Sequence, residues 1–538
     1  MNNNLTFDHY ITLNIDYSKV VNSTLDIEKD SILCIDLNNI EKLDNLILEG
    51  LKKGSKLILT SSKSTIENDN VYRYENFDEV FFDILENLSP DYKSKNYFGI
   101  TGTNGKTTTG YLLKQLIGST AAFVGTVDEE NYFSFTKEEH LTTPKLFNLV
   151  KLISNLNSDI DSIILEVSSH AIEQDRLKDI NFVISGFTKL RQDHLDYHIN
   201  MDEYLMTKSK LFNEDISNKF LFVDTDYGKK INLQHNCRGI SVGNMSSNDI
   251  EFLSYEDEII SFKIDGIKIQ ENLTITGPES VYNFLLAFGL AYYSKLYDIE
   301  ILINNIKTLK NPPGRFQVLD INENSIIVDY SHTPDAIEKV IRYTRELYQN
   351  EIIVVFGAGG NRDKSKRKMM GAASQFANKI IITNDNPRNE NPMEIAKEIL
   401  SGIDLQKDAK IILDRRKALE EAISLLNEKT TLLVLGKGHE KHQEIGDRLL
   451  DFDDVVVIKD ILGKIGIIVS GGLSFLFVIV STFLGVKFFK SRNIGQNIQE
   501  EVVFHEHKKG TPTMGGIFVI LGTIFGFFLS HINFWTIG

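Results

Sequence analysis

The sequence has very few cysteines, with only two among its 538 residues. Cys34 and Cys237 lie far apart along the chain, so a disulfide framework is not expected and a reducing cytosol fits. The N-terminus also lacks a basic stretch followed by an apolar core. Residues 1–5 are therefore not predicted to act as a secretory signal.

A positive net charge is also missing. The formal net charge is −16, from 58 basic and 74 acidic side chains. This balance argues against non-specific binding to nucleic acid, so no nucleic-acid partner is predicted. It does not exclude an anionic substrate, because local basic groups can still bind one. The chain is too long for a single core, and its content of 42% hydrophobic and 25% charged residues is ordinary for a globular protein, so several domains are expected.

Short apolar runs alternate with polar turns and helix-like stretches, which is typical of an α/β protein. In residues 1–90, runs such as 31–35 and 56–59 predict a small α/β domain. Further strand-like runs are at 97–98, 162–167, 182–184 and 220–223. Because helical stretches separate these runs, the pattern predicts a parallel sheet with crossover helices.

The best linker candidate is Asn-Pro-Pro-Gly at 311–314, after which the strand–helix alternation restarts. Three apolar runs follow, at 352–356, 380–382 and 432–435, and each ends in a polar or glycine-rich turn. Ligands in open α/β sheets bind beyond the carboxyl ends of the strands. These three turns are therefore candidate binding loops.

The most informative stretch is Gly-Ile-Thr-Gly-Thr-Asn-Gly-Lys-Thr-Thr-Thr at 99–109, which leads into a helix-like run at 111–117. A glycine-rich turn between strand and helix points backbone N–H groups at a phosphate, and the helix dipole adds attraction. Lys106 can reach the β- and γ-phosphates, and Thr107 can place a hydroxyl on Mg²⁺. Gly99 lies one position earlier than the general P-loop pattern requires. The alternative is a glycine turn without function, but Gly-Lys-Thr in this context favours nucleotide binding.

Two polar clusters follow. Glu166 ends a strand-like run, where a carboxylate can hold Mg²⁺ near phosphates, although a surface acid is the alternative. A dense polar patch that can hold a polar substrate comes directly after it and contains Ser168, Ser169, His170, Gln174 and Arg176. Residues 193–198 combine two histidines with two aspartates, which indicates either a metal or phosphate site or a solvated loop.

The end of the chain differs from the rest. Ile465 to Val486 and Gly515 to Trp535 are nearly all apolar or small, and each run is long enough to span a bilayer. A buried core helix is the alternative. The basic residues between the runs, which prefer the cytoplasmic side, are Lys487, Lys490, Arg492, Lys508 and Lys509. Because a cytosolic domain precedes the first run, these charges conflict with simple insertion. Either the first run does not insert, or the tail is an artefact or a non-functional appendage.

At this point the chain resembles the Mur ligases of peptidoglycan synthesis, in particular the type that adds the third residue of the stem peptide. The resemblance rests on motifs that occur in the family's order: Thr-Gly-Thr-Asn-Gly-Lys-Thr-Thr (101–108), Thr-Thr-Pro (142–144), Glu-Val-Ser-Ser-His-Ala (166–171), Asp-His-Leu-Asp-Tyr-His (193–198), Pro-Gly-Arg-Phe (313–316), Asp-Tyr-Ser-His-Thr-Pro-Asp-Ala (329–336), Asn-Arg-Asp-Lys (361–364), Asp-Asn-Pro-Arg (385–388) and Gly-Lys-Gly-His-Glu (436–440). It covers roughly residues 10–460.

The resemblance implies a three-domain α/β fold, and the residues after about 460 lie outside it. Residues 1–90 would bind the UDP-N-acetylmuramoyl group. Residues 91–312 would form the central P-loop ATPase domain, and 313–460 a Rossmann-like domain that binds the amino acid. The two apolar runs described above predict that residues 461–538 form a membrane segment with two transmembrane helices. Residues 507–516 in this segment resemble the start of phospho-N-acetylmuramoyl-pentapeptide-transferase, but its catalytic loops are missing, so no transferase activity is predicted.

The resemblance also implies roles for individual residues. ATP would be bound by Gly102, Thr103, Asn104, Gly105, Lys106, Thr107, Thr108, Asn283, Arg315, Asp329 and His332. Mg²⁺ would be held by Thr107, Glu166 and His194. The catalytic set would be Lys106, Lys208 and His194. The UDP-linked substrate would be bound by Ser18, Thr142, Thr143, Ser168, Gln174 and Arg176. Lys208 matches the carbamylated lysine of the family, and a carbamate anion can support Mg²⁺ where an ammonium would repel it.

The incoming amino acid would be bound by Arg362, Asp385, Asn386, Pro387, Arg388, Gly436 and Glu440. The planar fork of Arg388 suits a carboxylate, and meso-diaminopimelate has a second carboxylate at its far end where lysine has none. Glu440 would pair with the distal ammonium. The motif therefore favours diaminopimelate. The alternative for Arg388 is a role limited to capping a turn.

The implied activity is ATP-dependent ligation of meso-2,6-diaminopimelate to UDP-N-acetylmuramoyl-L-alanyl-D-glutamate through an acyl phosphate, with ATP and Mg²⁺ as cofactors. The ligase portion would be a cytoplasmic monomer, with anchoring to the inner membrane through the C-terminal spans as a further expectation. The alternatives are a lysine-adding ligase of the same type and a membrane-tethered pathway scaffold. Folylpolyglutamate synthase is a third, which Asp-Asn-Pro-Arg and Gly-Lys-Gly-His-Glu argue against.

Overall fold

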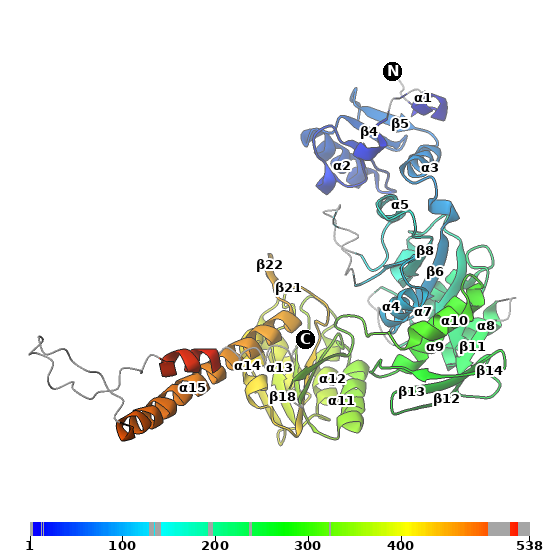
Figure 1. The fold of residues 1–538 in the computed structure, drawn as a ribbon. Coiled ribbons are helices and arrows are strands. Elements are labelled where there is room, and N and C mark those ends of the chain that lie inside the picture. The colour runs from blue at the N-terminus through cyan, green and yellow to red at the C-terminus, as the bar shows by residue number, and fades with distance from the viewer. Residues whose placement is uncertain are drawn as a thin grey trace, which may run out of the picture. The chain divides into compact units, whose positions relative to one another are not determined.

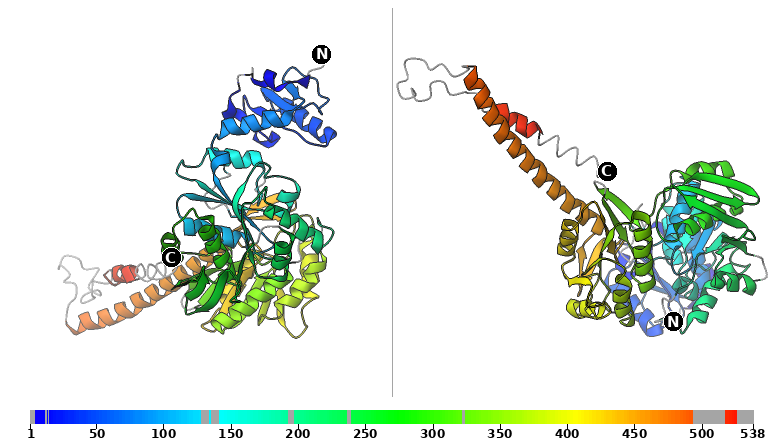
Figure 2. Two further views of the ribbon diagram at one scale, coloured as in Figure 1. Left: turned by 90° about the vertical axis from the view of Figure 1, so that its right-hand side faces the viewer. Right: turned by 90° about the horizontal axis from the view of Figure 1, so that it is seen from below.

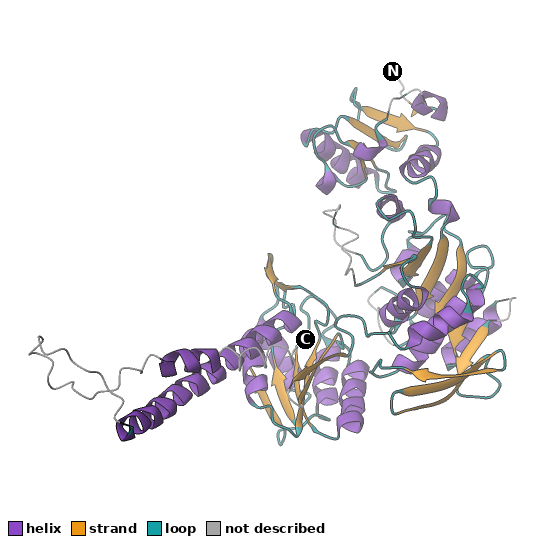
Figure 3. Cartoon of the chain, viewed as in Figure 1, coloured by secondary structure: helices purple, strands orange, loops and turns teal. Residues whose placement is uncertain are grey.

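The computed structural model describes residues 4–11, 13, 15–127, 134, 141–191, 197–235, 239–321, 324–492 and 517–525. The chain divides into two compact units, Met1–Pro312 and Pro313–Gly538. Helices and strands alternate through both units, and each unit is an α/β structure (Figure 1, Figure 3).

The first unit begins with a parallel sheet in the order β1-β5-β4-β3-β2. Its strands are β1 (Asn4–Leu5), β2 (Val20–Val21), β3 (Ile32–Cys34), β4 (Leu57–Ser61) and β5 (Val71–Tyr74), and its helices are α1 (Phe7–Ile11), α2 (Ile40–Lys52) and α3 (Phe77–Leu88). Helix α2 begins where Asn39 Oδ1 accepts a hydrogen bond from the N–H of Lys42 (2.9 Å), and it buries Leu43 and Ile47, one turn apart.

The second sheet of this unit has the order β14-β13-β12-β11-β10-β9-β6-β8-β7. Its strands are β6 (Asn96–Thr101), β7 (Ala121–Val124), β8 (Ser162–Glu166), β9 (Phe182–Phe187), β10 (Phe220–Val223), β11 (Ile240–Gly243), β12 (Ile250–Glu256), β13 (Ile259–Ile264) and β14 (Ile267–Asn272). Its helices are α4 (Lys106–Ile117), α5 (Leu146–Ser154), α6 (Ser169–Glu173), α7 (Met201–Ser209), α8 (Asp226–Gln234), α9 (Ser280–Ser294) and α10 (Ile299–Ile306). Pairing is parallel from β7 to β12 and antiparallel from β12 to β14.

The central strands of this sheet are apolar on both faces because helices cover both. Phe98 and Ile100 of β6 pack in one core with α4 and α9. Tyr97 of the same strand points to the opposite core, which α5 helps to form. Continuous apolar strands of this kind are the usual signature of a covered parallel sheet.

The second unit contains a sheet in the order β15-β16-β20-β17-β18-β19, parallel except at β15. Its strands are β15 (Gln317–Ile321), β16 (Asn324–Asp329), β17 (Glu351–Phe356), β18 (Lys379–Ile382), β19 (Asp408–Ile411) and β20 (Thr430–Leu435), and a separate antiparallel hairpin consists of β21 (His442–Ile445) and β22 (Arg448–Asp451). Its helices are α11 (Pro334–Tyr348), α12 (Ser365–Ser374), α13 (Pro392–Leu400), α14 (Arg415–Ser424) and α15 (Asp454–Ser491).

Helix α15 has two parts of different character. Its first turns bury Val457, Ile458 and Ile461 in the same core as α14 and the sheet. Its later part contains Gly471–Phe488, the one segment among the described residues that is long and apolar enough to cross a membrane. Residues 517–525 form a helix beside it, in contact where Phe477 stacks on Phe525 with ring centroids 4.7 Å apart (Figure 2).

The strand-like runs named from the sequence correspond to β3, β4, β6, β8, β9, β10, β17, β18 and β20, and the helix after the glycine-rich turn is α4, so these predictions are confirmed. The predicted boundary at residues 460 and 461 falls inside α15, which continues unbroken because its first turns belong to the core. Two spans are not confirmed. Within the described residues one candidate is found, and most of the second run lies outside them, as do residues 507–516.

Candidate functional site

The glycine-rich turn lies between β6 and α4, as a phosphate-binding loop requires. Gly102 and Gly105 adopt positive φ angles of 147° and 91°. A Cβ atom on Gly102 would overlap Thr188 Oγ1, so the loop needs glycine there for space as well as for conformation. Lys106 begins the helix and donates to the carbonyl oxygens of Gly102 (3.1 Å) and Thr103 (2.9 Å). The lysine is thus held across the loop.

Glu166 lies next to this loop because β8 pairs with β6 in parallel, with Glu166 opposite Ile100. Its carboxylate is fully buried and accepts hydrogen bonds from Thr126 N (2.8 Å) and Thr126 Oγ1 (3.2 Å). Within the described part of the chain no cationic side chain pairs with it. A buried carboxylate without a countercharge is costly, so its environment suits a bound cation.

The donors available for Mg²⁺ are oxygens, which this ion prefers. Thr107, buried in the first turn of α4, and Glu166 are the described members of the predicted set. His194 lies outside the described residues. Across the described ranges no group of three or more His, Cys, Asp or Glu side chains could hold a metal by itself. Thr107 and Glu166 are therefore the described side chains that fit Mg²⁺ by their oxygen donors.

Two further predicted residues lie at the loop. Lys208, in the last turn of α7, is buried and donates to Thr101 Oγ1 at 3.4 Å, and its ammonium lies 4.8 Å from the ring centre of Tyr204. Asn283 of α9 faces Gly105, because a Cβ atom on that glycine would overlap Asn283 Oδ1. Residues separated by more than a hundred positions thus meet at one turn.

The residues predicted to hold the UDP-linked substrate form one hydrogen-bonded network, with the exception of Ser18. Thr143 Oγ1 contacts Ser168 Oγ (3.2 Å), and its carbonyl oxygen accepts from Arg176 Nη1 (2.9 Å). Gln174 Oε1 accepts from Arg176 Nε (2.9 Å) and Nη2 (2.8 Å). Thr142 Oγ1 accepts from Thr126 Oγ1 (3.4 Å), and Thr126 and Thr143 both donate to Glu166. Burial lowers the pKa of Arg176, and Tyr197 opposes the change.

Ser18 is exposed to solvent, whereas His198 is buried. Ser18 is exposed in the N-terminal part of the chain and donates to Asp16 Oδ1 (2.6 Å), and no contact joins it to the network above. His198 is buried, with Nε2 2.9 Å from Ser169 Oγ and its ring against Tyr204. The solvated-loop alternative for residues 193–198 is therefore wrong for His198, while residues 193–196 lie outside the described ranges.

In the second unit, Arg315, Asp329 and His332 gather around Tyr330. The Arg315 guanidinium lies 4.4 Å from the Tyr330 ring centre, and His332 Nδ1 lies 2.9 Å from the Tyr330 carbonyl oxygen. Asp329 ends β16 and accepts from the N–H of Phe316 (2.7 Å). Burial raises the pKa of Tyr330 to about 12.

The residues predicted to bind the amino acid come from loops after β17, β18 and β20. Asn386 Nδ2 donates to Glu440 Oε2 (2.9 Å), which also pairs with Lys437 Nζ (3.2 Å). A Cβ atom on Gly436 would lie 2.9 Å from Asp385 Oδ2, and burial raises the pKa of Asp385. A Cβ atom on Gly359 would lie 3.2 Å from Arg388 Nη1 and 3.8 Å from the exposed Arg362, so both arginines border that glycine. Pro387 lies between Asn386 and Arg388.

Sequence reasoning missed the residues that support these loops. Arg415 and Asp454 are both fully buried and form an ion pair with Nη2 2.7 Å from Oδ2. Arg415 also donates to the carbonyl oxygens of Asn384 (3.3 Å) and Leu435 (3.1 Å), the residues that precede two of the loops. Thr126, Tyr204 and Tyr330 were missed as well. Tyr330 lies inside a quoted motif, but nothing in the sequence marks Arg415 and Asp454 as partners.

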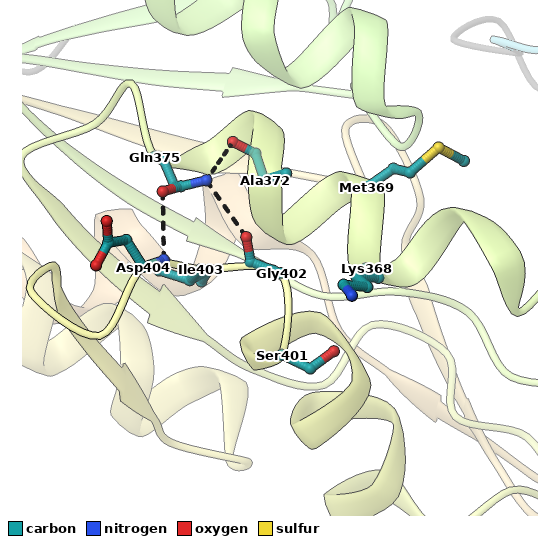
Figure 4. A pocket seen from close by; sticks show the side chains of 8 residues that line it. All are labelled: Lys368, Met369, Ala372, Gln375, Ser401, Gly402, Ile403 and Asp404. Atoms are coloured by element: carbon teal, nitrogen blue, oxygen red, sulfur yellow. Dashed lines mark hydrogen bonds between the residues drawn. The ribbon is translucent and has the colours of Figure 1, made fainter.

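A hollow of about 430 Å³ lies elsewhere in the second unit, between α12 and the turn after α13 (Figure 4). Gln375 crosses it, donating to the carbonyl oxygens of Ala372 and Gly402 (3.3 Å each) and accepting from the N–H of Asp404 (3.2 Å). None of the predicted site residues lines it. The predicted site residues therefore lie in the loops of each unit described above and not at this hollow.

Residues 100–291 match the Mur ligase middle domain, and residues 314–438 match the Mur ligase, glutamate ligase domain. The chain is 35% identical over 459 residues to the UDP-N-acetylmuramoyl-L-alanyl-D-glutamate--2,6-diaminopimelate ligase of Rickettsia montanensis, covering 82% of this chain and 94% of that relative. It is 37% identical over 389 residues to the ligase of the same name from Aquifex aeolicus, covering 69% and 78%.

Solved structures agree with these matches. A UDP-N-acetylmuramoyl-L-alanyl-D-glutamate--2,6-diaminopimelate ligase superimposes with a TM-score of 0.56 at 25% identity, covering 85% of this chain and 98% of that one. The MurF ligase of Thermotoga maritima, solved with ADP, superimposes with a TM-score of 0.57 at 16% identity, covering 78% and 95%, which shows a shared fold.

Proposed function

The chain belongs to the Mur ligase family, and from this premise we propose that it joins meso-2,6-diaminopimelate to UDP-N-acetylmuramoyl-L-alanyl-D-glutamate at the expense of ATP. Relatives with this name are aligned over most of the chain. The observation that carries the choice of amino acid is the loop cluster of the second unit, which holds Arg388 and Glu440 in the same network through Asn386 and Glu444. A guanidinium and a carboxylate are the complements of the distal carboxylate and ammonium of diaminopimelate.

ATP binds at the loop of residues 102–108 in this proposal. Backbone N–H groups at the start of α4 face the phosphates, and Lys106 places its ammonium on them. Thr107, Glu166 and His194 are the residues that would hold Mg²⁺. When bound, Mg²⁺ neutralises charge on the phosphates. Lys208 stands at the base of the loop, where a carbamate on its amine would add negative charge beside the ion. Arg315, Asp329 and His332 are the proposed ATP contacts of the second unit.

The reaction then proceeds in two steps. The D-glutamyl carboxylate attacks the γ-phosphorus of ATP, so that an acyl phosphate forms and ADP leaves. The free amine of diaminopimelate attacks the acyl carbon, the amide bond forms, and inorganic phosphate leaves. The network of Thr143, Ser168, Gln174 and Arg176 orients the first substrate. Positioning and charge neutralisation supply most of the acceleration in phosphoryl transfer of this kind.

Replacing Arg388 by alanine tests the choice of amino acid. Loss of a charge-assisted hydrogen bond to the distal carboxylate costs about 1.5–3 kcal/mol, so kcat/KM for diaminopimelate should fall roughly 10- to 100-fold. Lysine has no distal carboxylate, so kcat/KM for lysine should change little. ATP-dependent phosphate release with each amino acid and the muramyl dipeptide nucleotide measures both values. Arg448→Ala on the exposed strand β22 is the matched control.

Two results would contradict this proposal. Wild-type protein that releases no phosphate with either amino acid would disprove the ligase function. A wild-type preference for lysine would favour the lysine-adding alternative. An Arg388→Ala variant that retains the diaminopimelate preference would show that Arg388 does not select the amino acid.

We infer in addition that α15 tethers the ligase to a membrane. Support comes from its continuity: one helix packs Ile458 in the ligase core and then exposes a run of apolar side chains, with Phe475 69% and Phe483 70% exposed. Exposed apolar surface of this extent is unfavourable in water, and a bilayer removes the penalty. The proposal also draws on the sequence resemblance of residues 507–516 to the start of a membrane transferase, which would place this part of the chain beside a bilayer.

Liposome flotation of the full chain tests the tether. Wild-type protein should float with anionic vesicles, while the variant Phe475→Asp/Phe483→Asp should stay at the bottom of the gradient, because each buried aspartate costs about 2.5–3.5 kcal/mol. Leu405→Asp, at an exposed position outside α15, should float like the wild type. Wild-type protein that fails to float, or a double variant that floats equally well, would refute the tether.

A further inference from the structure

Arg388 has an unusual backbone conformation for an arginine. Its φ is +49°, in the left-handed region that favours glycine. The residue is held there from both sides by the hairpin: its N–H donates to the carbonyl oxygen of Glu444 in β21 (3.1 Å), and its own carbonyl accepts from the N–H of Gly446 in the turn that follows (2.8 Å). The hairpin β21–β22 stands apart from the six-stranded sheet (Figure 3). The hairpin therefore fixes the backbone of Arg388, and with it the position of the Cα atom from which the side chain extends.

The same strand also holds the guanidinium. Nε of Arg388 lies 2.6 Å from Glu444 Oε2, and Nη1 donates to the carbonyl oxygen of Gly360 at 2.9 Å. The third nitrogen, Nη2, makes no hydrogen bond or ion pair with any residue in the described ranges. With two nitrogens fixed, the plane of the guanidinium is set, and Nη2 remains available to a ligand.

Glu444 connects to the rest of the amino-acid site as well. Its N–H donates to Asn386 Oδ1 (3.0 Å), and the Asn386 amide in turn donates to Glu440 Oε2 (2.9 Å). Glu444 thus supports the Arg388 guanidinium, which suits a carboxylate, and through Asn386 it also supports the Glu440 carboxylate, which suits an ammonium. The Glu444 side chain is 43% exposed, so it can be changed without opening a core.

We propose that Glu444 is the positioning residue that aims Arg388 and thereby sets the selectivity of the site for an amino acid with a distal carboxylate. This inference rests on the proposed ligase function. The Glu444 carboxylate occupies the Nε edge of the guanidinium, restrains its rotation and leaves Nη2 directed at the substrate. A preorganised donor loses less conformational entropy when the substrate binds, which improves affinity without changing the chemical step.

The test compares Glu444→Ala, Glu444→Gln and Asp447→Ala in the full-length chain. Asp447 is an exposed acid in the turn of the same hairpin, so its removal controls for the loss of one negative charge there. Glu444→Ala should raise KM for diaminopimelate about fivefold, with kcat within twofold and KM for ATP unchanged. Glu444→Gln retains an acceptor for the Nε–H and should recover most of the loss. Asp447→Ala should match the wild type.

A double-mutant cycle separates positioning from a general structural effect. In an Arg388→Ala background, Glu444→Ala should add no further increase in KM, because the group that it aims is gone. An equal increase in that background would overturn the proposal. So would a lower KM in Glu444→Ala, which would show that Glu444 competes with the substrate carboxylate. If the wild type has no diaminopimelate-dependent activity, the proposed function itself fails. If the wild type is active and Glu444→Ala leaves KM for diaminopimelate unchanged, this inference alone fails.

Discussion

Lys106→Met should reduce ATP-dependent ligation about 100- to 1,000-fold, the cost of removing one preorganised charge from the transition state. The ammonium of Lys106 is held over the loop by the carbonyl oxygens of Gly102 and Thr103, and it is the group best placed to meet negative charge on the phosphates. The loss should appear in kcat, because charge on the transferred phosphoryl group and its oxygens must be stabilised in the transition state. Phosphate release with saturating ATP and both substrates measures it.

The matched control is Lys114→Met, further along the same helix α4. It removes the same charge and should leave kcat within twofold. The thermal unfolding midpoint of Lys106→Met should stay within a few degrees of the wild-type value, since the Lys106 side chain bonds to loop carbonyl oxygens and does not fill a hydrophobic core. A Lys106→Met variant with more than a tenth of the wild-type kcat would show that the loop does not bind the reacting phosphates.

Arg415→Met and Asp454→Asn should each destabilise the second unit by about 3–5 kcal/mol, because either change leaves one charge or polar group buried without its partner. Both side chains are fully buried, and Arg415 also satisfies the carbonyl oxygens of Asn384 and Leu435. For a unit of this size the loss corresponds to a fall of about 10 °C in its thermal midpoint. Calorimetry of the full chain, with the transition of this unit followed separately, measures it.

The double variant Arg415→Met/Asp454→Leu provides the internal test. Replacing both charges by apolar groups removes the unpaired partner, so this variant should melt above either single variant. Arg416→Met, at the exposed neighbouring position, should shift the midpoint little, since surface ion pairs contribute about 0–1 kcal/mol. Additive losses in the double variant would show that the pair acts as two independent groups and not as a buried ion pair.

Much of the candidate site could be predicted from the sequence, because its residues stand in short motifs whose chemistry is local. Gly102, Gly105 and Lys106 are close in sequence, and the loop that they form needs only a preceding strand and a following helix. Thr143 and Ser168 lie far apart, but the parallel register of a β-sheet brings loop residues to a common edge. Ser18 is the exception, since its hydroxyl donates to the neighbouring Asp16 and not to another predicted substrate contact.

The supporting residues could not be predicted in the same way. Glu444 is one acid among many along the chain, and only the bridge between Arg388 and Ile445 places it against the guanidinium. Arg415 is the first residue of α14, and nothing near it in the sequence marks it as buried. Its partner, Asp454, is 39 positions away, where α15 begins. Periodicity and motif spacing carry no information about such pairs.

The sequence by itself determined the alternation of strands and helices, the phosphate-binding loop and the chemical character of the binding loops, because these depend on neighbours within a few residues. Tertiary structure alone decided which charges are buried and what holds them. It paired Arg415 with Asp454, aimed Arg388 through Glu444, and joined the apolar segment to the ligase core in one continuous helix, α15. Burial and partnership depend on packing between distant segments, and hydrogen bonds and ion pairs become stronger where that packing excludes water.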